Sequence, residues 1–413
     1  MLSLKGETDS FSIPFFDAFC REVIWCMENS TFGLQRLLLV IAVCVFSAAG
    51  IVFVFRLLRD VSVSNLPEPP STSDESSAYL ADSSKCGECH VGQYQHYLES
   101  GHARTFWSTR DFPFRNRFTD LIFDDQERNR TFHYRTTESG IDVAVPGLFD
   151  GDRFPLQFAF GSGDNAITLM TLTPDGTGEP VGIEHRVSWL STMEQADLTP
   201  GQLGLAVSHD IEYFGRVVRG ATLERCFDCH TTSCSIRGDE LIDLIPNVGC
   251  ERCHPSSGSH AAAMDVAPAT SAIGFEETPW RSSQQIQICA ECHRGVNDIK
   301  ASQIRRDNPK IVRYQPVGLV QSKCYTESQR LLCSTCHDPH QHASKRTKRE
   351  YELTCLTCHS SSPQATQCSV SPDNDCVACH MPPVEIHPSV SFHDHWIRIR
   401  EERDLPAFED QKE

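Results

Sequence analysis

Residues 249–260, GCERCHPSSGSH, hold two cysteines three positions apart, a histidine directly after the second cysteine, and another histidine six positions later. The frame CxxCH recurs along the chain, and chance placement of 20 cysteines and 18 histidines over 413 residues would give on the order of 0.04 matches. We number its copies motif 1 to motif 7 in chain order: Cys86, Cys89, His90; Cys226, Cys229, His230; Cys250, Cys253, His254; Cys289, Cys292, His293; Cys333, Cys336, His337; Cys355, Cys358, His359; and Cys376, Cys379, His380. The repetition therefore reflects a chemical requirement.

The spacing within each motif fits covalent attachment of haem. Thiols at positions i and i+3 lie on one side of a helical turn, so both can bond to the two vinyl groups on one edge of a porphyrin. The histidine that follows then points at the iron as its proximal ligand. Structural zinc sites and thioredoxin-like redox pairs do not need that histidine, yet every CxxC pair in the chain has it. The motifs therefore predict seven covalently attached haem c groups.

The crowding of the motifs predicts the fold class. Six of the seven fall between Cys226 and His380, a span of about 155 residues. Roughly 26 residues per motif are too few to build a conventional hydrophobic core around each one, so the haems themselves should form most of the core. We therefore expect a multihaem cytochrome c made mainly of short α-helices and loops packed on stacked haems. A small β-rich insert and one N-terminal transmembrane helix complete the predicted fold.

An apolar run near the N-terminus predicts a membrane anchor. Residues 37–55, LLLVIAVCVFSAAGIVFVF, carry no charge over 19 positions, which is long enough to cross a bilayer as a helix. We expect an N-terminal cytoplasmic segment over 1–33, a transmembrane anchor over 34–58 and a flexible linker rich in Ser, Pro and acidic residues over 59–84. The alternative is a cleaved signal peptide, for which SAAG at 47–50 offers small residues.

The side of the membrane on which the haem domain lies is predicted from how haem is attached, and not from the charges around the apolar run. The charges that flank the apolar run do not orient it by the positive-inside rule. Covalent attachment of haem to CxxCH takes place on the outer side of the energy-transducing membrane in bacteria. We therefore expect a single-pass protein of the bacterial inner membrane with its haem domain in the periplasm. The net charge of −18 argues against nucleic acid as a partner.

The part of the chain beyond the linker divides into segments by the positions of the motifs and by the alternation of apolar and polar residues. We expect a first haem segment over 85–115, a β-rich insert over 116–222, a six-haem cytochrome domain over 223–400 and a charged tail over 401–413. The β-rich insert is predicted because stretches such as RTFHYRTT (130–137) and ITLMTLTPDG (167–176) alternate apolar and polar residues and end at Gly, Asp and Pro.

Several segments resemble bacterial multihaem cytochromes c, the group that includes cytochrome c-554-like and doubled-CxxCH proteins. These segments are CGECHVGQYQHYLESGHA (86–103), FGSGDNAITLMTLTPDG (160–176), GCERCHPSSGSH (249–260), QSKCYTESQRLLCSTCHDPH (321–340), CVACHMPP (376–383) and FHDHWIRI (392–399). The resemblance covers roughly residues 85–400. It departs after motif 3, where the family often has Gly-Pro-Gly and this chain has PSSG.

The resemblance also implies distal iron ligands. It places them at His102, His260, His340 and His395, and we count His185, His387 and His393 as further candidates. His260 lies too near His254 to reach the other face of the same haem, so we expect it to bind a neighbouring one. Ligation of this kind would tie distant segments together through metal bonds.

The predicted function is electron transfer between a quinol-linked donor and a periplasmic acceptor. A bis-histidine iron is six-coordinate, so it excludes substrate and rearranges little between its ferric and ferrous states. The alternative is a multihaem reductase or oxidase of small nitrogen or sulfur compounds at one five-coordinate haem. Related reductases often mark such a haem with CxxCK, which this chain lacks. We assign no catalytic residue, and a haem-based sensor would need a signalling domain that is not visible.

Overall fold

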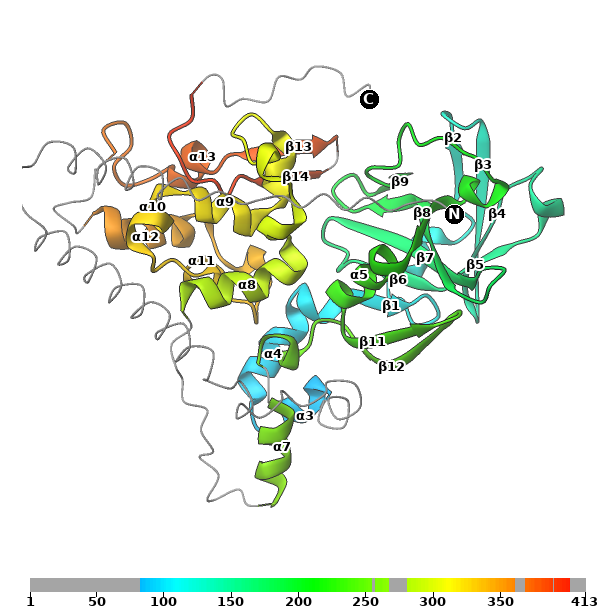
Figure 1. Cartoon of the computed structure of the whole chain (residues 1–413), viewed down its shortest axis with the longest axis horizontal. Helices are drawn as coiled ribbons and strands as arrows, with labels where there is room; N and C mark the ends of the chain where they lie inside the picture. The colour runs from blue at the N-terminus through cyan, green and yellow to red at the C-terminus, as the bar shows by residue number, and fades with distance from the viewer. Residues whose placement is uncertain (1–81, 255–256, 267–280, 361–367, 389, 402–413) are drawn as a thin grey trace, which may run out of the picture. The chain divides into compact units, whose positions relative to one another are not determined.

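A computed structural model describes residues 82–254, 257–266, 281–360, 368–388 and 390–401 (Figure 1). The predicted cytoplasmic segment, the predicted anchor, nearly all of the linker and nearly all of the charged tail lie outside these ranges. Within the described ranges, no helix combines the length and the apolar character needed to cross a membrane.

The first half of the described chain forms two antiparallel sheets. Consecutive strands pair in the four-stranded sheet, whereas the six-stranded sheet has the order β1-β6-β7-β8-β10 with β9 paired to β8. The strands of the first sheet are β2 (Ile122–Asp125), β3 (Arg130–Thr137), β4 (Gly140–Ala144) and β5 (Phe154–Leu156). Those of the second are β1 (Phe106–Ser108), β6 (Phe158–Phe160), β7 (Ala166–Pro174), β8 (Pro180–Leu190), β9 (Gln195–Leu198) and β10 (Gly215–Arg219).

These strands form because their apolar residues alternate and meet in one core. In β3, Phe132 and Tyr134 are buried and Arg135 is exposed, as the period of a strand requires. Phe132 packs in the main cluster with Ile167 and Phe214, all almost inaccessible to solvent. Each such side chain contributes about 1.5–3 kcal/mol through burial, so this region builds a core from protein alone.

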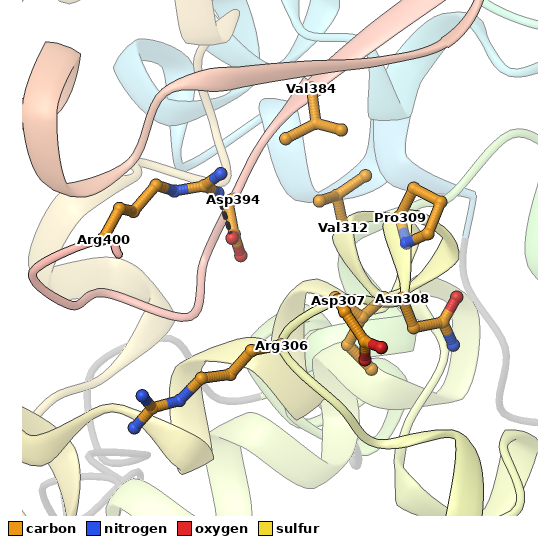
Figure 2. A pocket seen from close by; sticks show the side chains of 9 residues that line it. Arg306, Asp307, Asn308, Pro309, Val312, Val384, Asp394 and Arg400 are labelled. Carbon is orange, nitrogen blue, oxygen red and sulfur yellow. Dashed lines mark hydrogen bonds and ion pairs between the residues drawn. The ribbon is translucent and has the colours of Figure 1, made fainter. Parts of the chain in front are cut away.

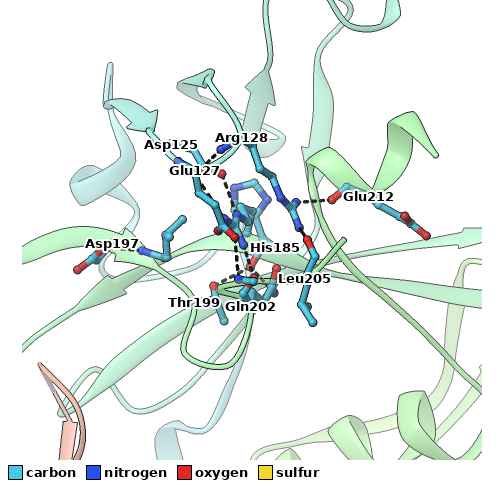
Figure 3. Close-up of polar contacts among 12 residues, drawn as sticks. Asp125, Glu127, Arg128, His185, Asp197, Thr199, Gln202, Leu205 and Glu212 are labelled. Atoms are coloured by element: carbon cyan, nitrogen blue, oxygen red, sulfur yellow. Dashed lines mark hydrogen bonds and ion pairs between the residues drawn. The ribbon is translucent and has the colours of Figure 1, made fainter. Parts of the chain in front are cut away.

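A buried ionic network closes one side of that core (Figure 3). The Arg186 side chain is fully buried, and its Nε donates to Asp125 Oδ2 at 2.8 Å. The same guanidinium also contacts Glu127 and donates to the Gln202 carbonyl. The network therefore fastens the loop after β9 to the end of β2.

Short helices carry the haem motifs (Figure 1). Motifs 2 to 7 lie, in order, in α5 (Gly220–His230), α6 (Cys250–Cys253), α8 (Ser282–His293), α11 (Cys333–Cys336), α12 (Lys348–His359) and α13 (Cys376–His380), and motif 1 spans the junction of α3 (Ser83–Gly87) and α4 (Val91–Glu99). The other α-helices described are α7 (Ser257–Val266), α9 (Gln315–Gln321) and α10 (Lys323–Ser328). The 3-10 helices described are η3 (His102–Arg104), η4 (Arg115–Phe118), η5 (Phe149–Gly151), η6 (Asp210–Tyr213), η7 (Val296–Asp298), η8 (Ala301–Gln303), η9 (Pro309–Arg313) and η10 (Ala343–Lys345).

The predicted fold class, mainly helices and loops with a small β-rich insert, is wrong because the described chain is rich in antiparallel sheet. The β region is a two-sheet body with its own core, and β1 begins before residue 116. Two further hairpins are described: β11 (Thr231–Arg237) with β12 (Glu240–Pro246) lies between motifs 2 and 3, and β13 (Pro383–His387) with β14 (Val390–His393) follows motif 7. Gly238, at a φ of 62°, supplies the positive dihedral that the two-residue turn after Arg237 needs. Spacing between motifs therefore underestimates how much sheet a short connection can hold.

Candidate haem-binding sites

The motif cysteines are presented on helical turns, as the spacing requires. In motifs 1, 3 and 5 the backbone N–H of the histidine donates to the carbonyl of the first cysteine at 2.9 Å. This bond closes one turn and brings the two thiols to the same side. None of the seventeen cysteines in the described ranges forms a disulfide, so the described motif sulfurs remain available for bonds to haem.

Four motif histidines each face one further imidazole. The ring centroids are 6.4 Å apart for His90 and His260, 6.3 Å for His293 and His102, 6.2 Å for His254 and His340, and 6.2 Å for His337 and His395. Four pairs with nearly one separation indicate one kind of site. The four non-motif members are the histidines for which the family resemblance implied a distal role.

This separation fits one iron between the two rings. A metal–imidazole bond is about 2 Å long and a ring nitrogen lies about 1.1 Å from its ring centroid, so two imidazoles on opposite sides of an iron place their centroids about 6 Å apart. The described residues therefore fit a haem iron with two axial histidines in motifs 1, 3, 4 and 5.

Each pair joins segments that are distant in sequence. His260 lies in α7 after motif 3 but faces motif 1, and His340 lies after motif 5 but faces motif 3. In the same way, His102 faces motif 4 and His395 faces motif 5. Axial bonds at these places would crosslink the polypeptide over long loops.

Backbone carbonyls hold several of these imidazoles by their Nδ1 atoms. His102 Nδ1 lies 3.1 Å from the Pro339 carbonyl, and His395 Nδ1 lies 2.9 Å from the His393 carbonyl. His230 shows the same arrangement, with its Nδ1 at 3.1 Å from the Thr105 carbonyl. Because Nδ1–H donates in each case, Nε2 is left bare to bind a metal.

Burial favours the neutral form of four of the paired imidazoles, and the neutral form is the one that binds metal. It lowers the pKa of His293 to about 4 and the pKa of His395 to about 4. Burial also lowers the pKa of His254 and of His337 below the ordinary histidine value. These four imidazoles can therefore bind an iron without first losing a proton at neutral pH.

Polar contacts hold the loop that carries His395, and Figure 2 shows the carboxylate of the preceding residue, Asp394, beside Arg400. Asp394 is buried and accepts from the Trp396 backbone N–H at 2.9 Å and from Arg398 Nη1 at 2.8 Å, and Arg400 contacts the same carboxylate. A small pocket lies beside it, lined by Arg306, Asp307, Asn308, Pro309, Val312 and Val384. Sequence reasoning missed Asp394, whose signal is its place directly before His395.

The three further candidates are placed differently. His185 is buried in β8, and its Nε2 lies 2.5 Å from the Tyr134 hydroxyl, so the structure puts it in the β core and not beside a motif (Figure 3). His387 ends β13, and His393 ends β14 with its Nδ1 at 2.7 Å from the Met381 carbonyl. Of the other motif histidines, His230 packs edge-on against the Phe160 ring, and His380 Nδ1 lies 3.0 Å from the Arg398 carbonyl.

The motifs touch one another in a continuous row. The Cys86 and Cys250 thiols interact directly, which joins motifs 1 and 3. Cys289 of motif 4 contacts Cys333 of motif 5. Helices α11 and α12 pack together, as do α12 and α13, which continues the row through motifs 5, 6 and 7. Cys253 of motif 3 lies near Cys289 and Cys292 of motif 4, so motifs 3 and 4 are neighbours. Motif 2 is also a neighbour of motif 4, because α5 packs against α8.

We compared the chain with families and structures of known proteins. Residues 209–255, which include motifs 2 and 3, match the family model described as cytochrome c554 and c-prime. No curated protein matches the chain. A solved structure, the crystal structure of the outer cell wall cytochrome OcwA, is similar with a TM-score of 0.41 and 12% sequence identity, covering 78% of this chain and 80% of that chain. The family match and the motif geometry support a multihaem c-type cytochrome with covalently bound haem c.

Proposed function

We propose that this protein is an electron carrier with seven covalently attached haem c groups, which passes electrons between a quinol-linked donor and a periplasmic acceptor. The observation that carries the proposal is the set of four imidazole pairs with centroids 6.2–6.4 Å apart. When bound, haem c supplies an iron that alternates between ferric and ferrous states and so carries one electron.

The chain's own residues favour transfer over substrate chemistry at the paired sites. In motifs 1, 3, 4 and 5 the two paired imidazoles would hold the iron together and would leave no position for a substrate. The carbonyls that hold Nδ1 of His102 and His395 keep the ligands fixed through a change of charge at the metal. The four sites are therefore arranged to change oxidation state with little movement.

The contact between motifs supports a route for electrons. Direct contacts lead from motif 1 to motif 3, and from motif 4 through motifs 5 and 6 to motif 7. Motif 3 adjoins motif 4, and motif 2 joins the row beside motif 4. The protein would accept an electron at one end of this row and deliver it at the other.

The location and partners rest on the sequence. The uncharged run over residues 37–55 supports attachment to the inner membrane, which is where a quinol-linked donor would be met. The CxxCH motifs support a haem domain in the periplasm. The charge of −18 is compatible with a basic redox partner protein and disfavours nucleic acid.

Mass spectrometry and spectroscopy of the purified protein test the proposal. We expect the mature mass to exceed the polypeptide mass by seven haems, and the ferric protein to give low-spin signals. A smaller whole number of haems would contradict the count. A high-spin fraction of about one seventh, with about one cyanide bound per molecule, would instead favour a reductase or oxidase at a five-coordinate haem.

A further inference from the structure

We infer that Asp338 is a positioning residue that gives the iron held by His254 and His340 the lowest reduction potential of the four paired sites. This inference rests on the proposed function, because it assigns an electrostatic property to one of its haems. It concerns a carboxylate outside the motifs and outside the ligand set.

The carboxylate of Asp338 is held against His340 by three contacts. Its Oδ1 accepts from the His340 backbone N–H at 3.0 Å and lies 3.1 Å from His340 Nδ1. Its Oδ2 accepts from Gln341 Nε2 at 2.8 Å. The aspartate therefore has little freedom to turn away from the imidazole.

His340 differs in this respect from the other ligands whose Nδ1 partner is described. His102 and His395 face backbone carbonyls, and His337 Nδ1 lies 3.5 Å from the Tyr351 hydroxyl. These partners are neutral dipoles, whereas Asp338 carries a full negative charge. The contrast singles out the site of motif 3.

A carboxylate at Nδ1 makes the imidazole a stronger electron donor at Nε2. The stronger ligand and the nearby negative charge both favour the more positive ferric iron over the ferrous iron, and so lower the reduction potential. Solvent reduces the effect, because the side chains of His340 and Asp338 are 42% and 47% exposed. We therefore expect a moderate shift.

The position of this site gives the shift a consequence. Motif 3 lies between motif 1 and motif 4 in the row of contacting motifs. An iron of low reduction potential at motif 3 is the last of the paired sites to be reduced, so electrons would reside on the neighbouring irons instead. Asp338 would thus set how electrons are shared between motif 1 and the rest of the row.

The test is Asp338→Asn in the full haem-loaded protein, followed by potentiometric titration with optical and EPR detection. Asparagine keeps an oxygen acceptor but removes the charge. We expect one midpoint potential to rise so that the ratio of oxidised to reduced iron at a fixed potential falls about tenfold, or ~59 mV for one electron. Asp338→Glu should restore the lower value.

Asp164→Asn is the matched control. Asp164 Oδ2 lies 2.9 Å from His342 Nε2, so it forms a similar carboxylate–imidazole pair, but His342 faces no motif histidine among the described ring contacts. We expect every midpoint potential to stay unchanged in this variant. Asp338→Ser serves as a second charge-removing variant in case the asparagine protein fails to load haem.

The inference is overturned if charge removal leaves all midpoint potentials unchanged in a protein that keeps its haem count and its low-spin signals. It is also overturned if Asp164→Asn produces the same rise. Failure of the proposed function looks different, because the unmodified protein would then lack seven haems or show a high-spin iron that binds cyanide.

Discussion

The imidazole of His254 lies almost parallel to that of His340, with an angle of 8° between the ring planes and 6.2 Å between the centroids. The rings of His102 and His293 are separated by nearly the same distance but cross at 82°. Because the two pairs share a centroid separation but differ in plane angle, the two sites would be alike in their ligands and distinct in the electronic structure of a bound iron.

The plane angles predict the EPR spectrum of the ferric protein. Each imidazole donates π density into the iron orbital that matches its plane. Parallel rings act on one orbital and separate it from its partner, whereas crossed rings act equally on both. We expect a rhombic low-spin signal from the site of His254 and His340, and a highly anisotropic low-spin signal from the site of His102 and His293.

Two matched variants assign these signals. His340→Ala should weaken the rhombic component and leave the highly anisotropic one unchanged, and His102→Ala should weaken the highly anisotropic component and leave the rhombic one unchanged. If both variants deplete the same component, the pairing of these imidazoles through iron is wrong.

Gly318 sets the position of His395, and Gly318→Ala should displace it. A Cβ at this place in α9 would lie 2.8 Å from the Trp396 nitrogen and 3.0 Å from the His395 carbonyl carbon. Both atoms are backbone, so the loop must move. We expect a loss of about 1–3 kcal/mol in the free energy of unfolding and a rise in high-spin iron, measured by denaturant titration and EPR.

Gly92→Ala controls for the helical glycine itself. Gly92 lies in α4 beside motif 1, and a Cβ there meets nothing within 4 Å. We expect stability to rise by about 0.5–1 kcal/mol, as for an exposed helical glycine, with no change in spin state. Equal effects from the two substitutions would show that close packing at Gly318 does not position His395.

Local patterns in the sequence predicted local structure better than they predicted the architecture. The CxxCH frame predicts a helical turn, and short helices carry motifs 2 to 7, while motif 1 spans the junction of α3 and α4. The alternation in residues 130–137 likewise predicted β3. In both cases a local pattern decides the outcome, because the period is visible within a few residues.

The contacts that orient the ligands could not be read from the sequence. The carbonyl of Pro339 holds His102, 237 positions away in the chain. No feature of the sequence around either residue predicts this contact. The extent of sheet was missed for a related reason. Strands β11 and β12 lie in the connection between motifs 2 and 3, where we expected short helices and loops.

Asp125→Asn should destabilise the β region strongly. Arg186 and Asp125 are both fully buried and joined at 2.8 Å, so removing the carboxylate charge leaves the buried guanidinium with only the partly exposed Glu127 as a carboxylate partner among the described residues. We expect a loss of about 3–5 kcal/mol in the free energy of unfolding, measured by denaturant titration, while the haem count stays the same. Asp124→Asn, on the exposed side of the same strand, should change it by about 0.5 kcal/mol or less. If Asp125→Asn also lowered the free energy of unfolding by only about 0.5 kcal/mol, the buried pair of Arg186 and Asp125 would not stabilise the β region as we expect.

His185 should make the β region sensitive to acid. Burial lowers the pKa of His185 to about 3 from its usual 6.5, so the folded state stays neutral while the unfolded state takes up a proton below pH 6.5. The free energy of unfolding is therefore not reduced by His185 above the pKa of the unfolded state. It declines as pH falls from about 6.5 toward 3, by up to about 1.4 kcal/mol per pH unit. His185→Gln can still accept from Tyr134 but cannot titrate, so its unfolding free energy should depend less on pH over this range, with the haem spectra unchanged. An unaltered pH dependence in that variant would show that His185 is not the titrating group, and loss of a low-spin signal would show that it binds iron after all.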